Sequence, residues 1–173
     1  VLVCGNIRTW ENCHQRDWLK NFDLFASTYT ERYNYHPFIQ SQVNAKEEII
    51  KPSECLEEFP FKSIRINRNK RDLELEEKFH PQMKEHFYGY YQYRTIRAGL
   101  SDIIDYELAY QFKYDIIVKT RFDMEYLQQL TQFDFENLDE IMIMQRNVFP
   151  ADNVIVAKRD VLFELVDYCL SQY

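Results

Sequence analysis

Short runs of apolar residues, separated by longer polar stretches, recur along this chain of 173 residues. Runs of this length predict β-strands rather than helices. The run at 115–118 is apolar and β-branched after its first residue, which suits a parallel strand covered on both faces. Residues 61–66 instead alternate between apolar and polar, so we expect that strand near a sheet edge. The predicted strands span residues 1–4, 23–28, 61–66, 115–118, 140–144 and 154–157.

Apolar residues at helical spacing predict two long helices, at residues 90–112 and 159–173. In the first helix the spacing extends to Glu107 or Leu108, and both fit it. Gly99 lies inside this helix, where glycine costs about 1 kcal/mol relative to alanine, so we expect close packing or a break there. Shorter helices are predicted at residues 10–22, at residues 45–50 and, together with a loop, within residues 126–138.

The order of these elements predicts an α/β fold with a mostly parallel central sheet. The first strand, the helix at 10–22 and the second strand form a βαβ unit, whose crossover is right-handed. The helix at 90–112 leads into the strand at 115–118 and makes a second crossover. We expect residues 1–173 to form a single domain, trimmed from a longer chain.

Polar side chains follow the predicted central strand, where ligands bind in open α/β sheets. They arrive at its carboxyl end: Lys119, Thr120, Arg121 and Asp123. Residues two apart in an extended segment point to the same side, so Arg121 and Asp123 would face one ligand. Arginine donates two parallel hydrogen bonds to phosphate, and a carboxylate suits a divalent cation. The pattern predicts a site for a metal-chelated diphosphate; the alternative is a surface ion pair at a strand end.

The loop after the first strand is expected at the same edge of the sheet. It contains Gly5, Asn6 and Arg8. Glycine adopts positive φ angles readily and lets a ligand approach the backbone. The basic run that includes Arg65 is a second, weaker candidate for phosphate, against the alternative of a solvated loop and short helix.

Composition and charge narrow the class of ligand. The formal net charge is −7, which argues against a general nucleic-acid binder but leaves room for a local basic pocket. Aromatic residues make up 16% of the chain, which is typical of half-buried ring packing or of sugar- and base-stacking surfaces. No apolar run approaches the roughly 20 residues needed to span a bilayer. The four cysteines form no CxxC pair, which favours free thiols over a zinc or redox motif: Cys4, Cys13, Cys55 and Cys169.

Several common phosphate and nucleophile motifs are missing from the sequence. It contains neither a GxSxG nucleophile elbow nor a GxxxxGK[ST] phosphate loop. With only 3 glycines it also lacks the GxGxxG dinucleotide fingerprint. The main remaining way to bind a phosphate is a cation held by a carboxylate, assisted by arginines.

Three segments together resemble a family of GT-A-type glycosyltransferases that occurs in bacterial surface-polysaccharide clusters and in large DNA viruses. They are GNIRTW at residues 5–10, YDIIVKTRFDM at 114–124 and DNVIVAKRD at 152–160. The resemblance implies a three-layer, Rossmann-like sandwich and transfer of a sugar from a nucleoside-diphosphate sugar. It also implies a glycan or glycoprotein acceptor and a location in the cytoplasm of a bacterium or of a virus-infected cell. The net charge and the apolar runs independently predict no nucleic-acid partner and no membrane span.

The resemblance also implies roles for individual residues. The sequence R-x-D stands where the family usually carries D-x-D, so Asp123 alone is left to bind a divalent cation, Mn²⁺ or Mg²⁺. Asp152 is the expected general base at the acceptor, or else a turn residue at a strand start. The residues expected to bind substrate are Gly5, Asn6, Arg8, Lys119, Arg121 and Asn153. The R-x-D sequence leaves a second possibility, a non-catalytic α/β module that binds a nucleotide or glycan.

Overall fold

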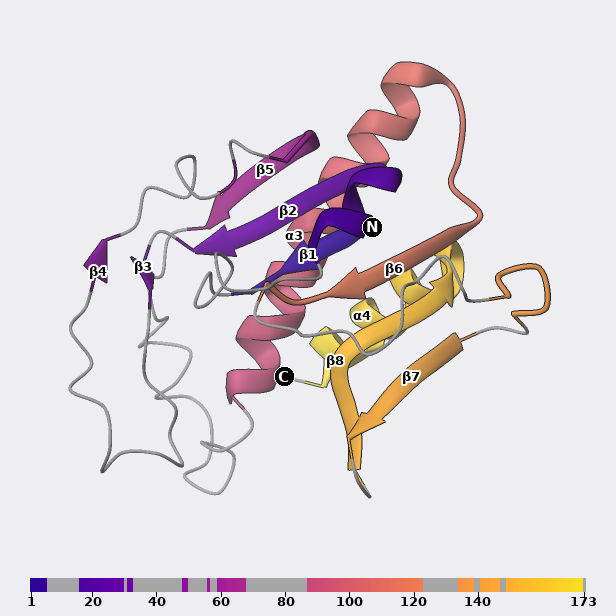
Figure 1. Ribbon diagram of the computed structural model, residues 1–173. Helices are drawn as coiled ribbons and strands as arrows, with labels where there is room; N and C mark the ends of the chain where they lie inside the picture. The colour runs from indigo at the N-terminus through magenta and orange to yellow at the C-terminus, as the bar shows by residue number, and fades with distance from the viewer. Residues whose placement is uncertain are drawn as a thin grey trace.

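The central feature of the fold is a six-stranded sheet with strand order β5-β2-β1-β6-β8-β7 (Figure 1). The computed structural model describes residues 1–5, 16–29, 31–32, 48–49, 56, 59–67, 87–122, 134–138, 141–146 and 149–172. The strands are β1 (Leu2–Cys4), β2 (Leu24–Tyr29), β5 (Phe61–Asn67), β6 (Ile116–Thr120), β7 (Ile141–Arg146) and β8 (Phe149–Lys158). A separate antiparallel pair consists of β3 (Glu31–Arg32) and β4 (Glu48–Ile49).

The sheet is mixed but mostly parallel. β1 runs parallel to both β2 and β6, and β2 runs parallel to β5. β8 is antiparallel to both β6 and β7, and its arrow in Figure 1 points opposite to those of β2, β5 and β6. The predicted α/β class and mostly parallel sheet are confirmed, and the alternating strand β5 lies at an edge as predicted.

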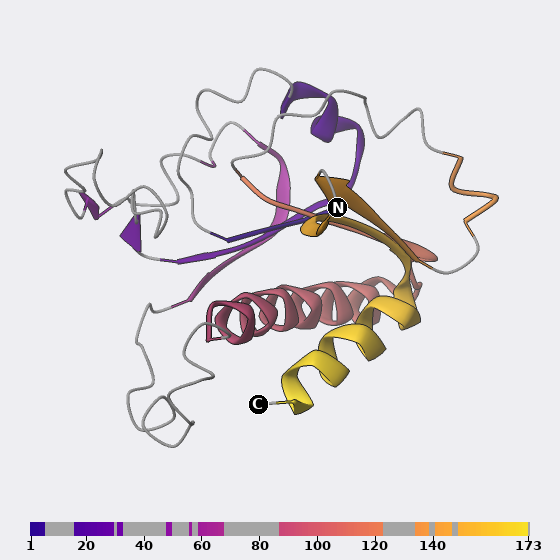
Figure 2. The same ribbon diagram turned by 90° about the horizontal axis from the view of Figure 1, so that it is seen from below.

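Two α-helices cover one face of the sheet. They are α3 (Phe87–Tyr110) and α4 (Arg159–Ser171), and Figure 2 shows both on the same side, with the 3₁₀ helix η2 (Arg16–Asn21) on the other. Both long helices match the predicted ones to within a turn. Gly99 explains how closely α3 approaches the sheet: a Cβ there would lie 2.6 Å from Leu2 Cδ1 and 3.0 Å from Ser27 Cβ. The glycine serves close packing, and α3 runs through it unbroken.

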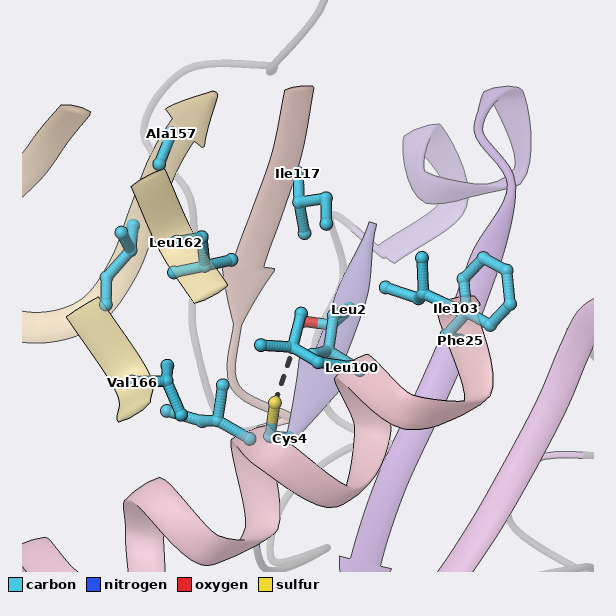
Figure 3. Packing of buried hydrophobic residues seen from close by; sticks show 11 residues of the cluster. Leu2, Cys4, Phe25, Leu100, Ile103, Ile117, Ala157, Leu162 and Val166 are labelled. Carbon is cyan, nitrogen blue, oxygen red and sulfur yellow. Dashed lines mark hydrogen bonds between the residues drawn. The ribbon is translucent and has the colours of Figure 1, made fainter. Parts of the chain in front are cut away.

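The central strands bury side chains on both faces, because successive residues of a strand point in opposite directions. Leu2 and Cys4 of β1 pack towards the helices, and Val3 packs on the other face. Figure 3 shows the helix-side cluster, where Leu162 and Val166 of α4 meet side chains of the sheet. The opposite cluster is completed by residues outside the sheet: Leu19, Leu56, Phe59 and Phe122.

The C-terminal end of α3 is a Schellman turn. Gln111 has a φ of 56°, and the Phe112 N–H donates to the Glu107 carbonyl oxygen at 3.1 Å. This turn sends the chain from α3 into β6 and so completes the second predicted crossover.

Four predictions about secondary structure need correction or lie partly outside the described residues. The helix predicted at 45–50 is wrong at Glu48–Ile49, because these residues pair with β3 as a strand and pairing overrides a weak local preference. Asp152 does not precede a strand: pairing with β7 extends β8 back to Phe149. Of the helix predicted at 10–22, only the 3₁₀ turn at Arg16–Asn21 lies among the described elements. Of the segment 126–138, only residues 134–138 are described, and they form a turn.

Candidate functional site at the carboxyl edge of the sheet

The four parallel strands β1, β2, β5 and β6 end at the same side of the sheet, which we call the carboxyl edge. Their last residues there are Cys4, Tyr29, Asn67 and Thr120. The opposite side, where these strands begin, is called the amino edge. Because ligands of open α/β sheets bind beyond the carboxyl ends of the strands, the carboxyl edge is the place to look for the predicted site.

The register of the central strands brings two predicted residues together. Val3 of β1 is the pairing partner of Thr120 of β6, so both strands leave the sheet side by side. Gly5 and Arg121 are the first residues after them. Although they are far apart in sequence, they enter the same part of the carboxyl edge, as predicted.

The antiparallel strand β8 reaches the same edge from the opposite direction. Ile155 pairs with Lys119 near the end of β6. Asp152 and Asn153 precede Ile155 in β8, so their backbone continues past the paired part of β6 towards the carboxyl edge. The topology thus brings the predicted acceptor residues to the edge that carries Gly5 and Arg121.

Gly5 combines a fixed backbone with open space. Its N–H donates to the Ser27 carbonyl at 3.0 Å, and its own carbonyl accepts from Thr28 Oγ1 at 2.9 Å. Its φ of 110° is one that residues with a side chain rarely adopt, and a Cβ placed there would have no atom of the described residues within 4 Å. Gly5 thus uses the positive φ angle that glycine adopts readily, and the approach of a ligand to its backbone stays a prediction.

Lys119 is almost completely buried and lies on the helix-covered face. Its pairing partners Leu2 and Ile155 both belong to the helix-side cluster, and paired residues share a face. Burial raises the pKa of the neighbouring Cys4 thiol to about 12, although the positive charge of Lys119 opposes this. Cys4 is therefore protonated and a poor nucleophile. Lys119 lies inside the protein beneath the edge, less accessible than a surface ligand residue would be.

Thr120 carries a feature that sequence reasoning missed. Its side chain is buried, and within the described part of the chain its Oγ1 is the one buried side-chain oxygen or nitrogen that lacks a hydrogen-bond partner. Burying an unpaired hydroxyl typically costs about 1–3 kcal/mol. The only signal in the sequence is a threonine that follows an apolar run at the strand end.

On the helix side of the carboxyl edge, three residues of β2 and β5 carry uncharged polar groups that are paired: Ser27, Tyr29 and Asn67. Ser27 Oγ donates to the Thr95 carbonyl at 2.8 Å, and Asn67 Nδ2 donates to Ser27 Oγ at 3.0 Å. Tyr29 Oη donates to the Tyr91 carbonyl at 2.9 Å and contacts the Thr95 hydroxyl. Burial raises the pKa of Tyr29. These contacts attach the first half of α3 to β2 and the end of β5 to β2, so they stabilise the structure around the edge.

Arg65, the weaker phosphate candidate, is engaged in an ion pair. Its Nε donates to Asp102 Oδ1 at 2.9 Å, and Ser63 Oγ donates to Asp102 Oδ2 at 2.9 Å. The hydrogen bond to Asp102 raises the pKa of Arg65. This arginine therefore connects β5 to α3.

The remaining predicted site residues are described only in part. Arg121 is half-buried immediately after β6. Asn6, Arg8 and Asp123 lie outside the described residues. Among the residues that are described, no group of three or more His, Cys, Asp or Glu side chains could hold a metal ion. In the same part of the chain, no helix has the length and apolar character needed to cross a membrane.

Comparison with known proteins gives no relative for this chain. No family model, curated protein or solved structure matches it. The molecule is thus defined by its own geometry, as an α/β protein whose candidate ligand site lies where β1, β6 and β8 meet at the carboxyl edge.

Proposed function

We propose that this protein is a glycosyltransferase that moves a sugar from a nucleoside-diphosphate sugar to a glycan or glycoprotein acceptor. The observation that carries the proposal is the register of β1, β6 and β8. It brings Gly5, Arg121 and the backbone of Asp152 to one sheet edge. The resemblance to GT-A enzymes supports the same reading, and with it a three-layer, Rossmann-like sandwich.

The donor would lie between the loop after β1 and the end of β6. Gly5 leaves room for the ligand beside its backbone. Arg8 and Arg121 would neutralise the diphosphate, because guanidinium groups match phosphate oxygens in shape and charge. Asn6 would hydrogen-bond the nucleotide sugar, and Lys119 would add positive charge from beneath the edge.

The acceptor would approach from the side of β8. In an inverting reaction, Asp152 accepts the proton of the acceptor hydroxyl as its oxygen bonds to the anomeric carbon and the bond to the diphosphate breaks. Asn153 would orient the acceptor. Asp123 is assigned to a divalent cation, Mn²⁺ or Mg²⁺, which when bound would supply charge neutralisation for the departing nucleoside diphosphate.

The first test is the substitution Asp123→Ala. The wild-type protein is incubated with a panel of UDP- and GDP-sugars, Mn²⁺ and mixed glycan acceptors, and the released UDP or GDP is measured. We expect release by the wild type and loss of release in Asp123→Ala, with an unchanged unfolding transition. Glu164→Ala is the matched control, because it removes an exposed carboxylate from α4.

The other outcomes separate the alternatives. Full activity in Asp123→Ala removes this residue from the site. Binding of a sugar nucleotide in calorimetry without turnover on any acceptor favours the non-catalytic binding module. No stabilisation by any member of the panel, even near 100 times the expected dissociation constant, where about 2.7 kcal/mol is expected, refutes both.

A further inference from the structure

A second surface of the protein has the character of a ligand site and lies at the amino edge, away from the candidate site. Three aromatic side chains at the end of α3 form it: Tyr106, Tyr110 and Phe112, which we call the aromatic cluster. Tyr110 is 65% exposed and Phe112 is 38% exposed. Large apolar side chains gathered at the surface mark interaction sites more often than isolated ones do.

The rings of the aromatic cluster are held in place by one another and by rings beneath them. The centroid of Tyr106 lies 4.5 Å from that of Tyr110 and 6.0 Å from that of Phe112. Tyr106 also packs edge-on against the buried Phe25, with centroids 5.4 Å apart. Phe112 packs edge-on against Tyr114 at 4.8 Å. Rings fixed in this way lose little conformational entropy when a ligand binds.

Gln111 stands between Tyr110 and Phe112 in the sequence and has an unusual backbone conformation. Its φ of 56° is in the left-handed region, where a residue with a side chain costs roughly 1–2 kcal/mol and glycine does not. The same turn could be made with glycine at lower cost. Gln111 is exposed, and its side-chain amide carries two donor hydrogens and an acceptor oxygen that a ligand could use. Exposed aromatic rings and a left-handed residue with a side chain thus occur together at the end of α3. Two such departures at one place indicate function more strongly than either alone.

Hydrogen-bonding groups border the cluster on the side of the sheet. Lys62 Nζ lies 5.9 Å from the centroid of the Tyr106 ring and 3.2 Å from Asp23 Oδ1. Tyr114 Oη donates to Asp23 Oδ2 at 2.8 Å. An ammonium and a carboxylate, both partly exposed, thus lie next to the aromatic rings.

The size and chemistry of this surface favour a sugar over a protein partner or a nucleic acid. Two exposed rings and the half-buried Tyr106 offer a few hundred square ångströms at most, whereas a stable protein interface buries roughly 1,200–2,000 Å². A nucleic acid is disfavoured by the net charge of −7. A sugar ring presents an apolar C–H face with hydroxyl groups around its rim. Exposed aromatic rings suit the C–H face, and nearby ammonium, carboxylate and amide groups suit the hydroxyl groups. We propose that the aromatic cluster and Gln111 bind a neutral oligosaccharide.

The test follows backbone amide signals in ¹⁵N–¹H NMR spectra while cello-, chito- and mannotriose are added to millimolar concentration. We expect at least one of these sugars to shift the amide signals of residues 106–112. Tyr110→Ala and Phe112→Ala should each weaken that binding about tenfold, the equivalent of about 1.4 kcal/mol. Leu108→Ala is the control: Leu108 is 72% exposed on the same helix turn, so the variant removes apolar area without removing a ring.

A second variant separates binding from folding. Gln111→Gly should weaken sugar binding several-fold while raising the midpoint of denaturant unfolding, because glycine relieves the left-handed conformation. The proposal is overturned if none of the three sugars shifts these amides, or if Leu108→Ala weakens binding as much as Tyr110→Ala. It is also overturned if sedimentation shows a dimer that Tyr110→Ala dissociates. Nucleotide-sugar binding at the carboxyl edge does not enter these readouts, so the two proposals can fail separately.

Discussion

The two edges of the sheet differ in how their buried polar groups are satisfied. At the amino edge, a charged network joins α3, α4 and the entry to β6 through Glu107 and Arg159. At the carboxyl edge, the described contacts are mainly between uncharged groups, Thr120 Oγ1 is unpaired, and Gly5 borders open space. The contrast indicates that the amino edge stabilises the fold, whereas the carboxyl edge gives up some stability where a ligand is expected.

Glu107 is the centre of the amino-edge network. It is only 3% exposed and accepts from Arg159 Nε at 2.8 Å and from Arg159 Nη2 at 2.7 Å. It also accepts from the Tyr114 N–H at 3.0 Å. The Arg159 N–H in turn donates to the Asp115 carbonyl at 2.9 Å. The end of α3, the start of β6 and the start of α4 are therefore fastened at one point.

The largest expected effect is at this carboxylate. Glu107→Ala should lower the free energy of unfolding by about 3–5 kcal/mol, because it leaves Arg159 largely buried without its main partner. Urea unfolding measures the change. The control is Asp167→Ala, which breaks the exposed Arg97–Asp167 pair of 2.8 Å and should cost about 0–1 kcal/mol. Equal losses in the two variants would show that the amino edge has no special role in stability.

The carboxylates of the amino edge should make the free energy of unfolding depend on pH in the acid range. Burial alone would raise the pKa of Glu107, but hydrogen bonds from Arg159 and the Tyr114 N–H outweigh it and lower the pKa below 4.5. The same balance holds for Asp23. Burial alone would raise its pKa, but hydrogen bonds from Tyr114 and Lys62 outweigh burial and lower the pKa. Both carboxylates bind protons more weakly in the folded state, so their contribution is complete above the unfolded pKa values.

Stability should therefore fall as the pH drops below about 4.5 and through the lowered folded-state pKa values. Urea midpoints measured from pH 7 to pH 2.5 check this, and Glu107→Gln should show a shallower decline than the wild type. A wild-type midpoint that stays constant throughout this range would contradict the role given to the amino edge.

How much of this could be predicted from sequence differs between elements. The buried run before Lys119 and the alternating run at β5 gave the correct strands and an edge position, because burial pattern is a local signal. The spacing in α3 could not choose between Glu107 and Leu108, and the intuitive choice of the apolar residue would have been wrong. Glu107 is the buried residue because Arg159 pairs with its carboxylate. That partner lies 52 residues away in sequence, so local spacing does not reveal it.

For the candidate site, the sequence predicted which edge of the sheet carries it but not how its residues are arranged there. The pairing of Val3 with Thr120 and of Lys119 with Ile155 is a long-range property that local patterns do not contain. The βαβ pattern still predicted that Gly5 and Arg121 share an edge, because it implies parallel strands and the carboxyl ends of parallel strands lie at the same edge. It could not reveal that Lys119 is buried or that Thr120 lacks a partner, since both depend on what the other elements cover.

The smallest expected change also has the opposite sign, which makes it the sharpest test of the contrast between the edges. Thr120→Val replaces an unpaired buried hydroxyl with a methyl group and should raise the free energy of unfolding by about 1 kcal/mol. Thr28→Val, at the same edge, removes the donor to the Gly5 carbonyl and should lower it by about 1 kcal/mol. Opposite shifts in urea midpoint would show that the Thr120 hydroxyl is unpaired in the folded protein and lowers its stability. If both variants lose stability equally, the Thr120 hydroxyl is paired within the protein, and the carboxyl edge is as fully satisfied as the amino edge.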